Sequence, residues 1–140
     1  MSKVAIVFWS ATGNTETMAN CIAEGAGANG TIVPCAEMTP AKLAEFDVVA
    51  FGCPAMGAEQ LEESEFEPMF AALEGSLNGK KIALFGSYGW GDGQWMRDWA
   101  QRAQDDGAQL FSEEGLICNE TPDDDVQAAC RKLGADLVAW

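Results

Sequence analysis

The sequence predicts an α/β fold: a doubly wound parallel sheet of five strands in the order 2-1-3-4-5, with helices on both faces. Two features of the chain carry this prediction. Segments that are apolar almost throughout, such as Val4–Trp9, are typical of parallel strands buried on both faces. They alternate with segments whose apolar residues recur at helical spacing. Because 140 residues with 48% hydrophobic content suit one core, we expect residues 1–140 to form a single domain.

The first half of the chain contains three of the strands, separated by two helices. The first helix starts at Asn14, and Gly27 and Gly30 stop it. The second helix is short, with Thr39 as its capping residue and Pro40 as its first residue. The strands are expected at Lys3–Trp9, Thr31–Cys35 and Asp47–Gly52.

The second half contains the other two strands and three helices. One helix is marked by the apolar positions Phe66, Met69, Phe70 and Leu73. A second is lined by Met96, Trp99 and Ala103 and closed by Gly107, and a third starts from Thr121, Pro122 and Asp124. The fourth strand is expected at Lys80–Gly86. The fifth is irregular: it starts at Ala108–Phe111, breaks at Glu113–Gly115 and resumes at Leu116–Cys118.

The composition of the chain excludes several classes of function. Twenty-two acidic and eight basic residues give a net charge of -14, which opposes binding to nucleic acid or anionic lipid and favours basic protein partners. No apolar stretch approaches the roughly 20 residues that cross a bilayer, and the amino terminus lacks a signal peptide's apolar region. We therefore expect a cytoplasmic protein. Five widely spaced cysteines and no histidine indicate neither disulfides nor a metal site, so we expect buried, reduced thiols.

The acidic residues are unevenly distributed. One run leads into the helix expected at Phe66–Leu73, and no basic residue stands between Arg102 and Arg131. Such runs form either a solvated surface or a docking surface for a basic partner, and the sequence leaves both interpretations open. The first run consists of Glu59, Glu62, Glu63, Glu65 and Glu67.

A loop rich in hydroxyl side chains joins the first strand to the first helix. It reads SATGNT and consists of Ser10, Ala11, Thr12, Gly13, Asn14 and Thr15. Backbone N–H groups at a helix amino terminus point toward an anion, hydroxyls add hydrogen bonds, and glycine lets the backbone come close. The loop lacks the GxxxxGK[ST] pattern of nucleotide hydrolases and carries no cation. It therefore suits a phosphate that is held permanently, although ordinary helix capping would use similar residues.

Two further loops follow the third and fourth strands. Because the carboxyl ends of parallel strands meet at one edge of a sheet, both loops are expected beside SATGNT. In the second loop, Cys53–Pro68, the thioether of Met56 can cover an aromatic ligand, unless it belongs to the core. In the third, GSYGWGDG, Trp90 lies among glycines and is better suited to stacking on a planar ligand than to core packing. Trp95 and Trp99 follow at helical spacing and are expected in the core.

Together the three loops resemble those of the short-chain flavodoxins, particularly those of anaerobic bacteria, and the resemblance covers nearly the whole chain. It implies a flavodoxin-like electron carrier, not an enzyme, with non-covalently bound FMN as cofactor. It implies that SATGNT holds the FMN phosphate, that Met56 and Trp90 cover the two flavin faces, and that Glu59 binds the flavin ring N–H. The implied contacts are completed by Pro54, Ala55, Gly57, Ala58, Ser87, Tyr88, Gly89, Gly91 and Asn119.

The resemblance also implies a redox mechanism. In flavodoxins the Gly57 peptide is expected to turn its carbonyl toward flavin N5 with the first electron, which favours the semiquinone. Ala58 stands where relatives often carry Asp, Asn or Gly, and Pro54 where some carry Ser. Alanine is strained where a type II turn needs a positive φ, so Ala58 should bias the turn toward the semiquinone. Acidic loops should disfavour the anionic hydroquinone, which implies a low-potential, one-electron carrier that shuttles between these states.

Competing functions fit the residues less well. A signalling receiver needs an acceptor Asp after the third strand, where this chain has Gly52 and Cys53, and no arginine follows Cys53 at the spacing of a Cys-dependent phosphatase. The open alternative is a small FMN-dependent quinone or nitro-group reductase, for whose extra pockets 140 residues leave little room. We therefore expect a monomeric carrier that serves redox enzymes with basic docking surfaces and binds neither nucleic acid nor membrane.

Overall fold

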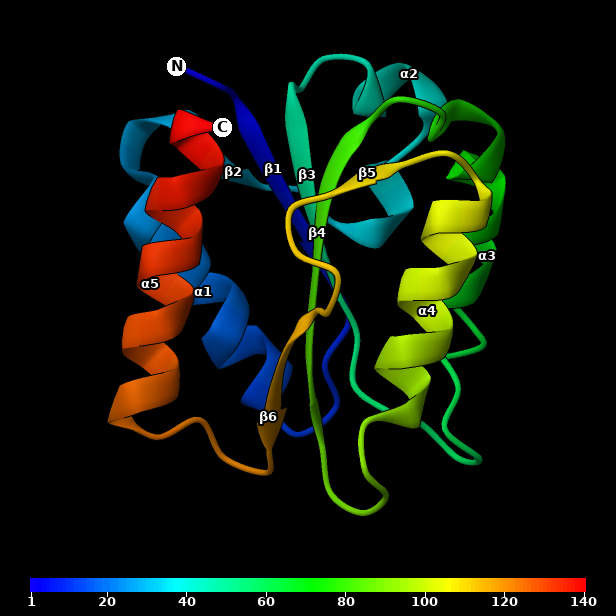
Figure 1. Ribbon diagram of the computed structural model, residues 1–140, viewed down its shortest axis with the longest axis vertical. Helices are drawn as coiled ribbons and strands as arrows, with labels where there is room; N and C mark the ends of the chain where they lie inside the picture. Colours follow the sequence, from blue (N-terminus) through cyan, green and yellow to red (C-terminus); the bar gives the residue numbers. More distant parts are fainter.

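A parallel sheet runs through the middle of the computed structural model, which describes residues 1–140, and helices cover both of its faces (Figure 1). The strand order is β2-β1-β3-β4-β5, and β6 also pairs with β4. The strands are β1 (Val4–Phe8), β2 (Gly30–Ile32), β3 (Val48–Gly52), β4 (Lys81–Tyr88), β5 (Gln109–Leu110) and β6 (Leu116–Asn119). The helices are α1 (Asn14–Ala26), α2 (Pro40–Leu43), α3 (Phe66–Leu73), α4 (Gln94–Asp105) and α5 (Asp124–Ala139). The predicted doubly wound fold is confirmed.

The irregular fifth strand is confirmed as well. β5 pairs with Lys81 and Ile82 at the start of β4, and β6 pairs with the segment from Phe85 to Tyr88. Residues 111–115 lie between the two strands and belong to neither of them. The strand is therefore split into two short pieces along the same edge of β4.

Most predicted boundaries differ from the structure by one residue at most, but three are wrong by two residues or more. β2 ends at Ile32 rather than at Cys35, because Pro34 has no N–H for a strand ladder and a 3-10 turn starts immediately after it. β4 continues to Tyr88, two residues beyond the glycine at which the prediction stopped it. The last helix starts at Asp124 and is capped by Asp123, whose side chain accepts an N–H of the first turn.

Two apolar cores hold the layers together. One consists of 22 buried residues between the sheet and the side that carries α3 and α4, and it includes Trp95 and Trp99, as predicted from their helical spacing. The other consists of 16 buried residues between the sheet and the pair α1 and α5. The two helices of that pair come close because Gly134 faces α1, where a Cβ atom would lie 2.0 Å from the carbonyl oxygen of Ile22.

The cysteines behave as expected from the composition. All five are free thiols, four of them are buried, and Cys35 is half-buried. Burial raises the pKa of the Cys53 thiol to about 12, so it stays protonated and unreactive. None of the helices combines the length and the apolar character that crossing a membrane requires.

Candidate functional site

The loops that follow β1, β3, β4 and β6 meet at the carboxyl edge of the sheet, at the lower end of Figure 1. A cavity of about 420 Å³ lies among them, within the size range of small-molecule sites. This is the edge that the strand order predicts for a ligand. The cavity is lined by Ser10, Ala11, Thr12, Asn14, Thr15, Pro54, Ala55, Met56, Ser87, Tyr88, Gly89, Glu120 and Thr121.

The amino terminus of α1 lies at this cavity. Gly13 precedes the helix with φ +95°, a left-handed conformation that favours glycine, and no side chain caps the first turn. The Ser10 hydroxyl accepts the N–H of Gly13 at 3.1 Å, which folds the loop over the helix end. The N–H groups of the first turn have no acceptors within the helix, and Asn14 and Thr15 line the cavity. The end of α1 is therefore a site for an anion.

The other long helices differ, because each has an acidic side chain at its amino terminus. Glu62 accepts the N–H of Phe66, the first residue of α3, at 2.9 Å. Glu59 accepts the N–H of Trp95, in the first turn of α4, at 2.8 Å. Asp123 does the same for α5 at 2.9 Å. Among the helices of eight or more residues, α1 alone leaves its positive end to a ligand.

The buried hydroxyl of Thr15 joins the first loop to the third. Its Oγ1 lies 2.9 Å from Ser87 Oγ and accepts the backbone N–H of Ser87 at 3.3 Å. Thr15 is 1% exposed and Ser87 5%. Thr12, in contrast, is exposed and has no such partner. Of the hydroxyls predicted for the anion, that of Thr15 thus also fixes the loop to β4.

The second loop forms a tight turn. Met56 and Gln60 exchange two backbone hydrogen bonds, of 2.8 and 2.9 Å, which close the turn around Gly57, Ala58 and Glu59. Gly57 has φ +50°, whereas Ala58 has no positive φ. Gly57 and Ala58 are exposed at the tip, so the backbone most suited to changing conformation is also the least restrained.

Glu59 connects this turn to the start of α4. Its Oε2 accepts the N–H of Trp95, and its Oε1 is buried without a hydrogen-bond partner. The carboxylate lies against Gly91, where a Cβ atom would come within 1.9 Å of Oε1. A buried carboxylate oxygen without a donor is costly, so Oε1 fits an N–H group of a bound ligand.

The third loop presents an aromatic side chain beside the cavity. Ser87, Tyr88 and Gly89 line the cavity, and Trp90 directly after them is 71% exposed. The side-chain N–H₂ of Asn119 donates to the carbonyl oxygens of Tyr88 and Gly89, each at 3.4 Å. Asn119 therefore lies against the third loop and does not line the cavity.

The structure brings most of the predicted site residues together, but not all of them. Eleven line the cavity, whereas Gly13, Trp90, Gly91 and Asn119 adjoin it in the chain or through hydrogen bonds, and the turn from Gly57 to Glu59 lies beyond it. Glu120 and Thr121 also line the cavity but were not predicted from the sequence. Glu120 donates its N–H to Tyr88 at 2.7 Å and has φ +60°. The rule that ligands lie at the carboxyl ends of strands could have found both residues after β6.

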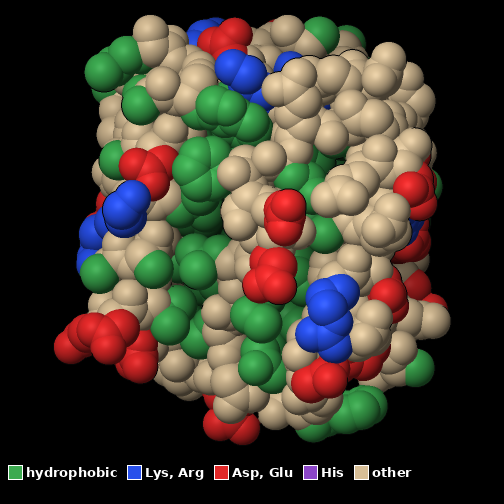
Figure 2. Space-filling view, in the orientation of Figure 1, with side chains coloured by type: hydrophobic (Ala, Val, Ile, Leu, Met, Phe, Trp, Pro, Cys, Tyr) green, Lys and Arg blue, Asp and Glu red, His purple; other side chains and the backbone are tan.

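The charge around this edge is predominantly negative. No lysine or arginine lines the cavity, whereas the acidic residue Glu120 lines it. Figure 2 shows acidic side chains at the lower end of the molecule, where Asp123, Asp124 and Asp125 are exposed. Arg97, the basic residue at the start of α4, pairs with Asp92 at 2.9 Å. A bound anion is thus held by N–H and hydroxyl groups rather than by a cation.

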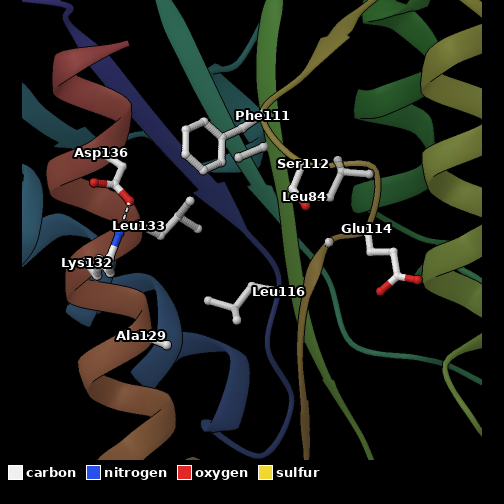
Figure 3. A pocket seen from close by; sticks show the side chains of 11 residues that line it. Leu84, Phe111, Ser112, Glu114, Leu116, Ala129, Lys132, Leu133 and Asp136 are labelled. Carbon is white, nitrogen blue, oxygen red and sulfur yellow. Dashed lines mark hydrogen bonds and ion pairs between the residues drawn. The ribbon is translucent and has the colours of Figure 1, made fainter.

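A second cavity, of about 320 Å³, lies between α5 and the split between β5 and β6 (Figure 3). Phe111, Leu116 and Leu133 give it an apolar lining, and Lys132 and Asp136 form an ion pair at 2.7 Å on its α5 side. None of the predicted site residues lines it. It contains no uncapped helix end and no unpartnered buried polar atom, so the carboxyl edge remains the candidate site.

Known proteins similar to this chain include several flavodoxins. The flavodoxin family matches residues 6–133. The flavodoxin of Megasphaera elsdenii is 48% identical over 134 residues, which cover 94% of this chain and 95% of that protein. The flavodoxin of Clostridium beijerinckii is 43% identical over 136 residues, or 95% of this chain and 97% of that protein. The solution structure of two-electron reduced Megasphaera elsdenii flavodoxin has a TM-score of 0.84 at 44% identity and covers 98% of this chain and 99% of that one.

Thr15 and Thr12 should differ in what they stabilise. Thr15→Val leaves the buried N–H and hydroxyl of Ser87 without their partner, so the free energy of unfolding of the ligand-free protein should fall by about 1 to 3 kcal/mol. Thr12→Val, at an exposed position, should change it by less than about 0.5 kcal/mol. Urea unfolding followed by tryptophan fluorescence measures both values, and equal losses in the two variants would contradict the assignment.

Proposed function

Because the chain belongs to the flavodoxin family, it is an FMN-binding electron carrier rather than an enzyme, and we propose that residues 1–140 form one domain with FMN at the carboxyl edge of the sheet. The uncapped amino terminus of α1 supports this placement most directly. It offers unpaired N–H groups beside the hydroxyls of Ser10 and Thr12, which suits the FMN phosphate. FMN supplies redox chemistry in one-electron steps, and the protein supplies binding, orientation and electrostatics.

The residues at this edge also suit the flavin ring. We propose that Met56, which lines the cavity, covers one face of the ring and that the exposed Trp90 covers the other. The unpartnered Oε1 of Glu59 would accept the ring N–H. The other proposed contacts are those predicted from the sequence, namely Ala11, Gly13, Asn14, Thr15, Pro54, Ala55, Gly57, Ala58, Ser87, Tyr88, Gly89, Gly91 and Asn119, together with Glu120 and Thr121.

We propose that the second electron enters at low potential because the site opposes added negative charge. No cation lines the cavity, and the phosphate itself is negative. At ~10 Å and an effective dielectric constant of ~60, each carboxylate contributes only about 0.5 kcal/mol, so several must act together. Glu63, Glu65 and Glu120 are exposed near this edge and are the candidates.

The turn at Gly57 and Ala58 supports a bias of the first one-electron couple toward the semiquinone. In the observed form Gly57 has a positive φ, which costs a glycine little, and Glu59 has φ +60°, whereas Ala58 has none. The alternative, type II form would place a positive φ on Ala58, at a cost of roughly 0.5 to 1 kcal/mol relative to glycine. We propose that the observed form is the one that the protein favours after the first electron has arrived.

Ala58→Gly should therefore lower the potential of the first one-electron couple. Glycine removes the strain from the alternative turn, so the form that precedes reduction gains roughly 0.5 to 1 kcal/mol of stability. A redox titration followed by visible absorbance compares the two proteins. If the first potential of the variant is unchanged or higher, the turn does not bias the couple in this way.

The partners follow from the charge of the chain. Flavodoxins donate electrons to redox enzymes, and a net charge of -14 with exposed acids at the carboxyl edge supports partners that dock through basic surfaces. We further propose that the protein acts as a monomer in the cytoplasm. The relatives do not favour the alternative of a quinone or nitro-group reductase.

The carrier function is tested with purified, FMN-loaded protein. After chemical reduction it should pass single electrons to a basic haem protein at a rate that falls as ionic strength rises, because salt screens the attraction. An acidic acceptor of similar potential is the control and should react more slowly, with the opposite salt dependence. Sustained turnover of NAD(P)H with a quinone would instead establish a reductase.

A further inference from the structure

Glu62 differs from the other members of the acidic run that begins at Glu59. It is 5% exposed, whereas its neighbour Glu63 is exposed. Oε1 of Glu62 accepts the N–H groups of Glu65 and Phe66, at 2.8 and 2.9 Å. Oε2 accepts the N–H of Ser64 at 2.8 Å and also the Ser64 hydroxyl. Four donors around one buried carboxylate make it part of the framework rather than of a solvated surface.

The Glu62 carboxylate stays ionised throughout the physiological range. Burial alone would raise its pKa, but the hydrogen bonds from the Ser64 hydroxyl and from the N–H groups of Phe66, Ser64 and Glu65 outweigh burial and lower the pKa to about 2. Phe66 is the first residue of α3 and Ser64 and Glu65 directly precede it, so the positive end of the helix also favours the negative charge. The link between Glu62 and α3 is therefore permanent under physiological conditions.

Glu62 also closes the loop that carries the turn from Met56 to Gln60. Its backbone N–H donates to Cys53 Sγ at 3.3 Å, so the two ends of a ten-residue segment meet. At its start this segment is fixed to β4, because Cys53 donates its N–H to Phe85 and Ala55 donates its N–H to Ser87, each at 3.1 Å. At its end the segment is fixed by Glu62. Between these anchors the turn has its own two backbone hydrogen bonds and the one from the N–H of Trp95 to Glu59 Oε2, and its tip at Gly57 and Ala58 is exposed.

We infer that Glu62 is a positioning residue for the redox site: it sets where the turn of Met56 to Glu59 lies against the cofactor, without touching the cofactor. The inference rests on the proposed function, because it assumes that this turn contacts FMN. Glu62, a buried member of the acidic run, would thus act by positioning the turn and not only through its negative charge. If Glu62 only stabilised α3, its loss would weaken the fold but leave the cofactor's properties intact.

The test compares Glu62→Gln with Glu63→Gln, which removes the same charge from the adjacent, exposed position. Glutamine keeps the size of the side chain but turns an N–H₂ group toward backbone N–H donors, so the end of the loop loosens. Glu62→Gln should raise the dissociation constant of FMN about tenfold and lower the first-couple potential by up to about 59 mV, the equivalent of a tenfold change for one electron. Glu63→Gln should change the dissociation constant less than about twofold and leave this potential unchanged or slightly higher, as loss of an acid predicts.

Several results would overturn the inference. These are equal effects of the two substitutions on both quantities, a higher first-couple potential in Glu62→Gln, or a variant with lower thermal stability but wild-type affinity and potential. If Glu62→Gln does not fold, Ser64→Ala carries the test, since it removes one of the four donors and should raise the dissociation constant about twofold to threefold with the potential falling. No change in Ser64→Ala would then count against the inference. Failure of the unchanged protein to bind FMN would refute the proposed function instead.

Discussion

The site depends on one unsatisfied helix end. At the carboxyl edge of the sheet, the amino termini of α3, α4 and α5 each meet a carboxylate of the chain itself, from Glu62, Glu59 and Asp123. The first turn of α1 has no such partner and faces a cavity lined by hydroxyl groups. An acidic protein without a cation at this place can still hold a phosphate, because oriented N–H groups supply the positive potential.

The same helix-end electrostatics orders the rest of the site. Glu59 and Glu62 both follow the exposed tip at Gly57 and Ala58, and each anchors the loop to a different helix through a charge-assisted hydrogen bond. The tip is free to change its backbone, while the loop is held before it by the bond from Ala55 to Ser87 and after it by the two acids. This combination suits a carrier, whose cofactor must stay in place while one peptide responds to its charge. Thr15 and Ser87 fix the loop that precedes α1 to β4 through hydrogen bonds between neutral groups.

The fold and the loops of the site could be predicted from the sequence because buried parallel strands and glycine-rich turns leave strong patterns. The split fifth strand was also predictable, since Glu113–Gly115 interrupts two apolar pieces. What the sequence could not reveal was the burial of one acid within a run of acids: Glu62 and Glu63 look alike until tertiary contacts separate them. The end of β2 was misjudged because apolar residues continue past Pro34, whose missing N–H stops the strand.

The measurement that tests the central claim most directly compares the binding of FMN and riboflavin to the cofactor-free protein. The two ligands share the flavin ring and differ in the phosphate that α1 is assigned to hold. If that helix end anchors the cofactor, several charge-assisted hydrogen bonds are lost with riboflavin, and its dissociation constant should be at least about 100-fold higher. Equal affinities in a fluorescence titration would show that the aromatic and ring contacts hold the cofactor and that the open end of α1 does not.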